Sequence, residues 1–255
     1  MSQKNDRNDA EAICTALRQP NMRFVPTKNE EQQDIQAIHR ARQRLVNHRT
    51  ALVSQIRGLL LDRGIAIPVA ITRFRRLMPD ILVDGDNPLT AIARETIADL
   101  YDFLLDLDKR VKVFDRKIEK IFRQNEDCQR IAKVSGVGPK TATAIVAAVG
   151  DGCEFKNGRH MAAWLGLVPR QSSSGDRQVL LGITKRGDRH LRTLLVHGAR
   201  AVVRVAAKKD DPFSRWVNEL RHRRGAAKAI VAVANKNARI LWAILHSKEE
   251  FRPHW

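Results

Sequence analysis

The residues best suited to chemistry lie in the segment 164–192, where three serines are surrounded by basic side chains. Ser172, Ser173 and Ser174 are consecutive, and Gly175 follows them. A serine hydroxyl can serve as a nucleophile, and cations around it can stabilise the charge of a transferring phosphate. By themselves, three serines before a glycine are more typical of a flexible polar turn. The basic residues around and after them are Arg170, Arg177, Lys185, Arg186, Arg189 and Arg192.

A pair of carboxylates near the start of the chain is the second candidate for chemistry. Asp6 and Asp9 lie three residues apart in a segment, 4–19, whose apolar positions have helical spacing, so both project from one helix face. Such a pair can contribute to a divalent-metal site if further carboxylates come from elsewhere. Helix capping is the simpler explanation, with Asp6 as the cap and Asp9 complementing the positive helix end.

The composition favours a polyanionic partner. Among 255 residues, 46 Lys and Arg oppose 28 Asp and Glu, which gives a formal charge of +18. Nucleic acid is the usual polyanion for so basic a chain, and an apolar fraction of 43% is enough for a core. No apolar run of about 18 residues indicates a membrane span, so we expect a soluble, cytoplasmic protein. Three cysteines without ligand spacing predict neither a disulfide framework nor a zinc site: Cys14, Cys128 and Cys153.

A long helix is expected to begin near Thr27, because Thr27 and Glu30 resemble a capping box. Its apolar stripe has a seven-residue repeat, while basic residues such as His39 occupy the other faces. Gly64 and Pro68 should end it. The stripe consists of Ile35, Ile38, Leu45, Leu52, Ile56 and Leu59.

A second long helix is predicted over residues 90–124, after a turn-rich connection that contains Pro79, Gly85 and Pro88. Its heptad pattern is the clearest periodicity in the chain. Two such helices predict an antiparallel pair or a dimerising arm, and an ordinary bundle core explains the pattern equally well. Its apolar positions are Leu100, Leu104, Leu107, Val111, Phe114, Ile118 and Ile121.

The segment 135–141, SGVGPKT, resembles the turn of a helix-hairpin-helix. Gly136 and Gly138 would let backbone amides approach a phosphate, Lys140 adds charge, and Thr141 would cap the following helix. Such a hairpin grips the sugar-phosphate backbone without reading bases. A simple link between two packed helices is the alternative. Further helices are expected around 161–165 and over 190–204, 213–223 and 226–246.

Four motifs together resemble one family of insertion-sequence transposases. KNDRNDA near the start, SGVGPKTA, WLGLVPRQSSSG and GITKRGDRHLRTLL occur in that order and span nearly the whole chain. The family combines a RuvC-like DEDD domain with a C-terminal domain that bears a catalytic serine, and its members are RNA-bridge-guided recombinases. The first motif and the segment 164–195 are the most specific parts, because the hairpin alone would match many DNA-binding proteins.

The resemblance implies a role for particular residues. The family's serine lies five residues beyond the proline of a GLxP signature, which residues 166–169 supply here, and this selects Ser174 over Ser173 and Ser172. The last two acidic residues of the DEDD site are spaced DxxD, as Asp6 and Asp9 are, and they would bind Mg²⁺. The residues we expect to contact DNA are Gly136, Gly138, Lys140, Thr141, Arg170, Arg177, Lys185, Arg186 and Arg192.

The chain departs from the family pattern in one respect. A DEDD site needs four carboxylates, and the two that belong to strands before DxxD are absent from this sequence, so the chain resembles the C-terminal part of a longer transposase. We therefore expect a mainly α fold with three parts. These are a remnant of the α/β RuvC-like domain (1–27), a long antiparallel coiled-coil arm (28–125), and a helical transposase domain with the helix-hairpin-helix and a serine loop (126–255).

The function expected on this basis is cutting and rejoining of DNA through the serine and the metal-binding carboxylates, impaired by the incomplete site. The expected partners are the insertion-sequence ends and target DNA, a structured guide RNA, and a second copy of the chain through the long helices. The alternative is a non-catalytic DNA- or RNA-binding protein that uses the hairpin and the basic arm, such as an inhibitor or scaffold or a structural RNA-binding coiled coil.

Overall fold

The computed structural model describes residues 5–20, 27–174 and 177–252. Within these ranges the fold is mainly α, as predicted, with ten helices and one two-stranded antiparallel sheet. The elements are α1 (Asp6–Arg18), α2 (Glu30–Leu61), α3 (Ile71–Val83), α4 (Ala91–Gln124), α5 (Glu126–Ile131), α6 (Pro139–Val149), α7 (Gly158–Trp164), β1 (Pro169–Ser174), β2 (Arg177–Ile183), α8 (Arg189–Ala206), α9 (Pro212–Arg224) and α10 (Ala226–Ser247).

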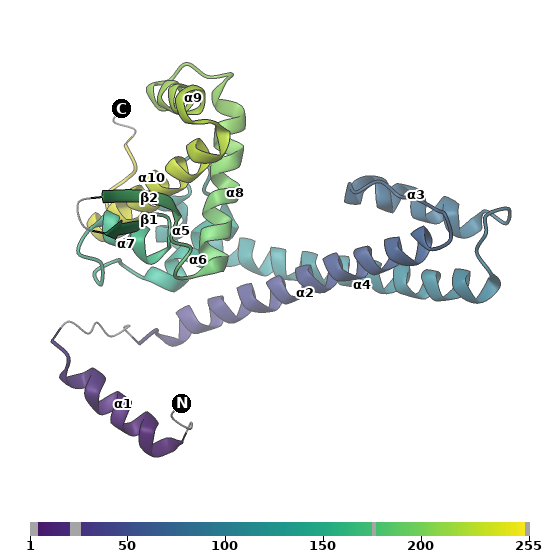
Figure 1. The fold of residues 1–255 in the computed structure, drawn as a ribbon, viewed down its shortest axis with the longest axis horizontal. Coiled ribbons are helices and arrows are strands. Elements are labelled where there is room, and N and C mark those ends of the chain that lie inside the picture. Colours follow the sequence, from purple (N-terminus) through teal and green to yellow (C-terminus); the bar gives the residue numbers. More distant parts are fainter. Residues whose placement is uncertain (1–4, 21–26, 175–176, 253–255) are drawn as a thin grey trace.

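Helices α2 and α4 form a long arm that extends from a compact C-terminal bundle (Figure 1). They run antiparallel and pack against each other, which is one of the arrangements that the sequence left open. Helix α4 begins where the sequence predicted, and the Thr90 side chain caps it by accepting a hydrogen bond from the backbone amide of Ala93. The core of the arm includes Leu52, Ile56, Phe74, Met78, Ile97 and Leu104. None of the helices described is long and apolar enough to cross a bilayer.

The start of α2 and its apolar stripe differ from the prediction. Asn29 and Gln32 form the capping box, two residues beyond the predicted Thr27 and Glu30, and the helix begins at Glu30. Leu59 is 37% exposed, whereas its neighbour Leu60 is fully buried. A straight α-helix has 3.6 residues per turn, so a strict seven-residue stripe drifts around its axis and the buried face moves to neighbouring positions.

Helix α3 occupies much of the connection that we predicted to be turn-rich, so that prediction is wrong at Pro79, whereas Gly85 and Pro88 do lie in the turn that follows α3. Phe74 and Met78 of α3 are fully buried against the arm. Pro79 lies inside the helix and has no amide hydrogen for the carbonyl of Arg75 one turn earlier. The Tyr101 hydroxyl of α4 donates to that carbonyl over 3.4 Å, which satisfies the group left free by the proline.

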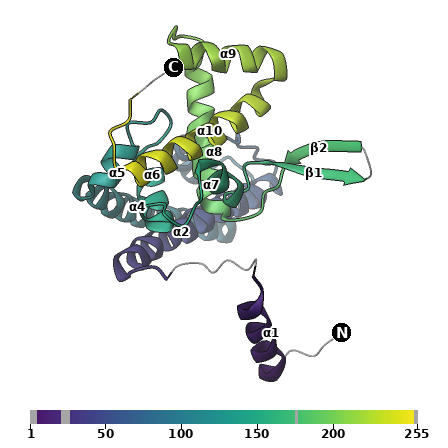
Figure 2. The same ribbon diagram turned by 90° about the vertical axis from the view of Figure 1, so that its left-hand side faces the viewer.

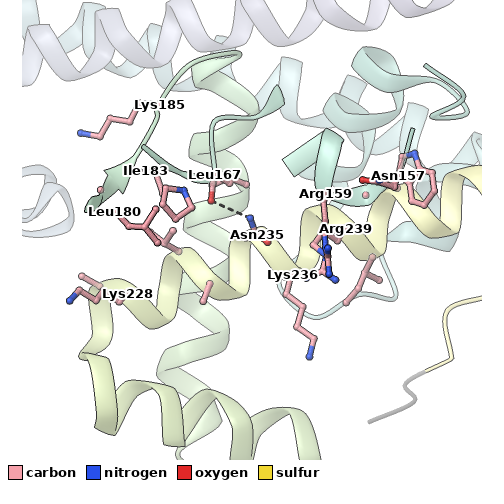
Figure 3. A pocket seen from close by; sticks show the side chains of 18 of the residues that line it. Asn157, Arg159, Leu167, Leu180, Ile183, Lys185, Lys228, Asn235, Lys236 and Arg239 are labelled. Carbon is pink, nitrogen blue, oxygen red and sulfur yellow. Dashed lines mark hydrogen bonds between the residues drawn. The ribbon is translucent and has the colours of Figure 1, made fainter. Parts of the chain in front are cut away.

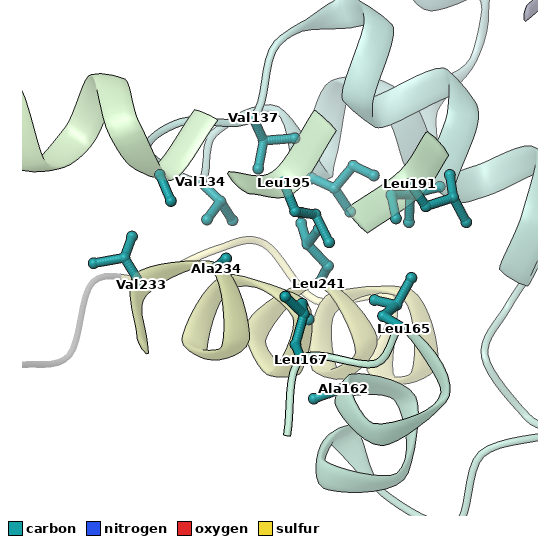
Figure 4. Packing of buried hydrophobic residues seen from close by; sticks show 14 of the residues in the cluster. Val134, Val137, Ala162, Leu165, Leu167, Leu191, Leu195, Val233, Ala234 and Leu241 are labelled. Carbon is teal, nitrogen blue, oxygen red and sulfur yellow. The ribbon is translucent and has the colours of Figure 1, made fainter. Parts of the chain in front are cut away.

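The C-terminal bundle packs α5–α10 around one apolar core (Figure 4). Leu195 of α8, Leu241 of α10 and Leu165 after α7 are almost completely buried there. The turn before α6 passes very close to α8: a Cβ added at Gly198 would overlap the carbonyl oxygen of Gly136. These two glycines therefore allow a backbone-to-backbone contact that no larger residue permits.

Helix α6 joins the arm to the bundle, because it packs on both α2 and α4. The His39 Nε2 and Thr143 Oγ1 atoms lie 2.9 Å apart, and the Gln36 side chain donates to the carbonyl of Ala147 over 3.0 Å. Arg42 and Lys140 both contact the Asp115 carboxylate, at 2.6 and 2.8 Å. His39 is only 5% exposed, so the prediction that it lies outside the packed face of the helix is wrong.

Candidate active site and nucleic-acid surface

Ser174 lies at the end of a β-hairpin that projects from the bundle (Figure 2). Strand β1 pairs antiparallel with β2, and Ser174 is in register with Arg177. The predicted serine loop is therefore a strand in the part described, with Ser172, Ser173 and Ser174 all in β1. Gly175 lies outside the described residues. Ser174 therefore ends β1 on the side of the hairpin away from its base.

The base of the hairpin is held by a close contact between two sequence motifs. A Cβ at Gly166 would overlap the carbonyl oxygen of Arg186, and one at Gly187 would overlap that of Trp164. Gly166 and Gly187 both have positive φ angles, of 70° and 90°. The backbone amide of Lys185 donates to the carbonyl of Gly166 over 3.2 Å. The glycines of both motifs thus fix the direction in which the hairpin leaves the bundle.

Arg192 stabilises the contact at the base of the hairpin. This structural role distinguishes it from the other cations predicted to bind DNA near the hairpin. Its guanidinium donates to the carbonyl oxygens of Leu165 and Arg186, at 3.2 and 3.4 Å. Arg170, Lys185 and Arg186 are exposed around the hairpin base. Their contact with DNA stays a prediction, whereas Arg192 has a structural role that its sequence position did not reveal.

Asp6 and Asp9 lie in the first turn of α1, and both are exposed. Asn5, one residue before Asp6, is the N-cap, because its side chain accepts from the backbone amide of Asn8 over 2.8 Å. Asp6 is therefore not the cap that the simpler explanation required. Helix α1 lies apart from the hairpin, so the structure does not bring the two aspartates and Ser174 together (Figures 1 and 2). No group of three His, Cys, Asp or Glu residues among those described has the geometry of a metal site.

The predicted helix-hairpin-helix consists of α5, the turn and α6, but its residues have different environments. Gly138 is the N-cap of α6, and a Cβ there would meet no other atom within 4 Å. Thr141 lies inside α6 and is 6% exposed, so the prediction that it caps the helix is wrong. Gly136 packs directly against the backbone of α8, so little space is left there for a phosphate. Gly138 is thus the member of this set best placed to admit a phosphate at the helix start.

Lys140 belongs to the junction with the arm as well as to the turn. Burial alone would raise the pKa of Asp115, but hydrogen bonds from Arg42 and Lys140 and their charges lower it. This ion pair joins α6 to α4. Any phosphate contact by Lys140 would have to compete with a carboxylate 2.8 Å away.

Other basic residues near the hairpin were not selected from the sequence. Lys228, Lys236 and Arg239 lie on α10, next to β2, and they line a groove with Lys185 (Figure 3). In the sequence these cations interrupt an otherwise apolar helix, and that interruption was the one available indication of a basic face. Three cations at positions 228, 236 and 239 fall on one face of a helix.

Comparison with known proteins identifies the class. A model described as "Transposase IS116/IS110/IS902 family" matches residues 128–214, and a DEDD transposase model of the IS110 group matches residues 1–63. The chain is 48% identical over 254 residues to a probable family 20 transposase of Pseudomonas aeruginosa, covering 98% of this chain and 74% of that protein. It is 46% identical over 251 residues to the transposase for insertion sequence element IS1111A of Coxiella burnetii, covering 98% and 69%.

These matches define the class of the protein as a transposase. A third relative, the transposase for insertion sequence element IS1328 of Yersinia enterocolitica, is 35% identical and covers 95% of this chain and 72% of that protein. The chain belongs to the IS110/IS116/IS902 family of insertion-sequence transposases. Membership in this family implies DNA phosphoryl transfer.

Proposed function

We propose that the chain is the serine-bearing and DNA-binding part of a transposase that cuts and rejoins DNA through a phosphoserine. The observation that carries this proposal is the position of Ser174 at the tip of a hairpin whose base is fixed by glycine contacts. A nucleophile on a projecting, well-anchored element can meet a phosphodiester that a larger basic surface holds in place.

In the proposed reaction the Ser174 Oγ atom forms a bond to a DNA phosphorus, and the bond from that phosphorus to one DNA strand breaks. The serine loses its proton, and the departing DNA oxygen becomes a hydroxyl when it takes up a proton. A hydroxyl on another DNA end then attacks the phosphoserine and restores the serine. One phosphodiester is replaced by another, so the exchange needs no external energy source.

The metal that this family implies does not fit the described residues by themselves. Asp6 and Asp9 supply carboxylates of the kind that Mg²⁺ prefers, but a two-metal site needs more ligands than these two. We propose that they are two of the four DEDD ligands. The 255 residues on their own would then bind DNA and transfer strands poorly, and the complete reaction would also use the predicted second copy and guide RNA.

The test is capture of labelled DNA on this chain. The chain is mixed with the longer Pseudomonas relative whose corresponding serine has been changed to alanine, together with Mg²⁺ and nicked DNA of the element ends. We expect the relative to supply the carboxylates of the DEDD site, and its greater length separates the two proteins on a denaturing gel. We expect labelled adduct on the 255-residue chain, a yield lower by at least about tenfold without the helper, and no adduct with Ser174→Ala.

Ser172→Ala and Ser173→Ala are the matched controls for the same hairpin. Both variants should retain the adduct, because only the residue at the strand end is proposed to attack the phosphate. An adduct that persists in Ser174→Ala, or that disappears in Ser173→Ala instead, would contradict the assignment.

A second candidate function is non-catalytic DNA binding through the turn at Gly138, as in an inhibitor or scaffold of a full-length relative. The pair of carboxylates in α1, without further metal ligands in the described residues, favours it. Gly138→Val should weaken duplex binding by a similar factor on unrelated sequences, because the turn would contact only the backbone. The open space around Gly138 lets the variant fold. Unchanged affinity at several salt concentrations would exclude the turn as the clamp.

A further inference from the structure

A large groove lies beside the base of the serine hairpin. It has a volume of about 1590 Å³ and is bounded by β2, α7, α9 and α10. Figure 3 shows Leu180 and Ile183 of β2 on one side and Lys228, Asn235 and Lys236 of α10 on the other. The Asn235 side chain donates to the carbonyl of Leu167 over 3.2 Å and ties α10 to the hairpin base. A space of this size exceeds the 300–1,000 Å³ typical of small-molecule sites and suits a segment of polymer.

The charged side chains of the groove are all cationic. Within the part of the chain that the structure describes, no carboxylate belongs to the lining. Lys228 and Arg239 are exposed and belong to one face of α10, and Arg159 and Lys185 contribute from α7 and from the loop after β2. Burial and the charge of Arg239 lower the pKa of Lys236. Such a field of one sign selects an anionic ligand.

The rest of the lining is apolar and includes aromatic rings. Trp216 and Trp242 contribute to the groove, and Leu180 and Leu181 of β2 are 69% and 41% exposed. The Lys236 Nζ atom lies 4.5 Å from the ring centroid of Trp216. Exposed bases of a single strand stack on apolar and aromatic surfaces while cations contact the phosphates, whereas a duplex hides the faces of its bases. The mixture of surfaces therefore favours a single strand over a duplex.

The groove begins close to the proposed nucleophile. Leu180, which lines the groove, pairs with Gln171, three residues before Ser174. Three residues of a strand span about 10 Å, since each adds about 3.3 Å. The wall of the groove at Leu180 is therefore separated from the level of Ser174 by only about 10 Å of strand.

We propose that this groove binds the single-stranded DNA that adjoins the phosphate attacked by Ser174, an inference that rests on the proposed function of the hairpin. The cations of α10 contact its phosphates, and Trp216 with the leucines of β2 contacts its bases. The groove thereby holds unpaired nucleotides beside the serine while strands are exchanged. DNA is the ligand because the hairpin that presents the nucleophile also forms the groove wall.

The test compares three labelled probes by fluorescence anisotropy: a twelve-nucleotide oligo-dT, its oligo-U counterpart and a mixed-sequence duplex. The variant Lys228→Glu/Arg239→Glu changes two exposed residues of α10. We expect it to weaken oligo-dT binding at least tenfold at low salt and to reduce the salt slope by about 1.4, since each single-strand phosphate contact contributes about 0.7. Duplex binding through the turn at Gly138 should change less than threefold.

Lys112→Glu/Lys120→Glu, two exposed lysines of α4, is the control with the same change of net charge. It should alter oligo-dT affinity less than threefold. As a second measurement, tryptophan emission of the unaltered chain should fall on oligo-dT binding, and Trp216→Phe should reduce that fall. Far-ultraviolet circular dichroism establishes that each variant is folded.

Several outcomes would overturn the inference while leaving the proposed function intact: duplex binding without oligo-dT binding, equal losses in the groove and control variants, or unchanged oligo-dT affinity in the groove variant. Preferential binding of oligo-U that the groove variant loses would assign the groove to RNA and overturn the DNA proposal. Binding of none of the three probes would instead contradict the proposed function itself.

Discussion

The arm and the C-terminal bundle achieve close packing in different ways. The arm is a two-helix seam of large aliphatic side chains, with α3 packed on its far end and ion pairs along its edge. The bundle has smaller residues, and its backbones meet directly at glycines, as Gly136 and Gly198 do. An arm held together by side-chain contacts should tolerate an added side chain at its glycine. The bundle, in contrast, depends on a few glycines at which two backbones touch.

The ion pairs give the arm its register. Asp108 of α4 accepts from Arg49 of α2 at 3.3 Å and lies 2.7 Å from the Arg75 guanidinium of α3. One carboxylate, at 17% side-chain exposure, therefore connects α3 to both helices of the arm. Apolar seams alone allow two helices to slide by a turn, and a charged pair at one level penalises that movement.

The largest effect is expected from a methyl group in the bundle. Gly198→Ala places a Cβ on the carbonyl oxygen of Gly136, so the two backbones must separate. We expect the free energy of unfolding to fall by about 3 kcal/mol. Urea titration followed by tryptophan fluorescence measures it, because Trp164, Trp216 and Trp242 all lie outside the arm.

The matched change in the arm is Gly58→Ala in α2, where an added Cβ meets nothing within 4 Å. Alanine is the better helix former, so this variant should gain about 0.5–1 kcal/mol. If both alanines had the same effect, the distinction between a glycine-dependent bundle and a tolerant arm would be wrong.

The second effect concerns the three-helix carboxylate. Asp108→Ala leaves Arg49 and Arg75 without their shared partner, and we expect a loss of about 1–2 kcal/mol in stability. The emission of Tyr101, the single tyrosine in the chain, reports on the arm during urea unfolding. Asp106→Ala is the control, because its pair with Arg110 is exposed and should contribute less than about 0.5 kcal/mol. Equal losses of stability in the two variants would show that the bridging position of Asp108 adds nothing to the free energy of unfolding.

The sequence predicted what depends on local periodicity and missed what depends on distant partners. The 90–124 helix follows from a repeat within one segment. Helix α3 was missed because the group that compensates Pro79 is Tyr101, on another helix. The serine hairpin was missed because its polar residues are typical of a turn, and strand pairing is a contact between two segments.

The candidate site shows the same limit. Family resemblance selected Ser174, and the pattern alone could not have separated it from Ser172 and Ser173. Arg192 was predicted to bind DNA from its charge, but the carbonyls it contacts belong to residues 6 and 27 positions away in the sequence. The basic face of α10 was missed because its cations are dispersed in an apolar helix, and the groove forms only where β2, α7 and α9 lie beside that face.

The smallest effect tests the junction between the two regions by pH. Burial first, and then the charges of His190, Arg42 and Lys140, lower the pKa of His39 from 6.5 to about 4. The Thr143 hydroxyl donates to the carbonyl of Pro139 over 2.8 Å, so it accepts from the Nε2–H of a neutral His39.

Because the unfolded chain binds a proton at His39 more readily than the folded chain, this residue's contribution is present above pH 6.5 and is lost as the pH falls toward 4. Between pH 7 and 5.5 the loss should be about 1 kcal/mol. His39→Gln should show a correspondingly weaker pH dependence in urea titrations, since glutamine can still donate to Thr143 and does not titrate. An identical pH dependence in both proteins would mean that the arm and the bundle are joined without any contribution from the protonation state of His39.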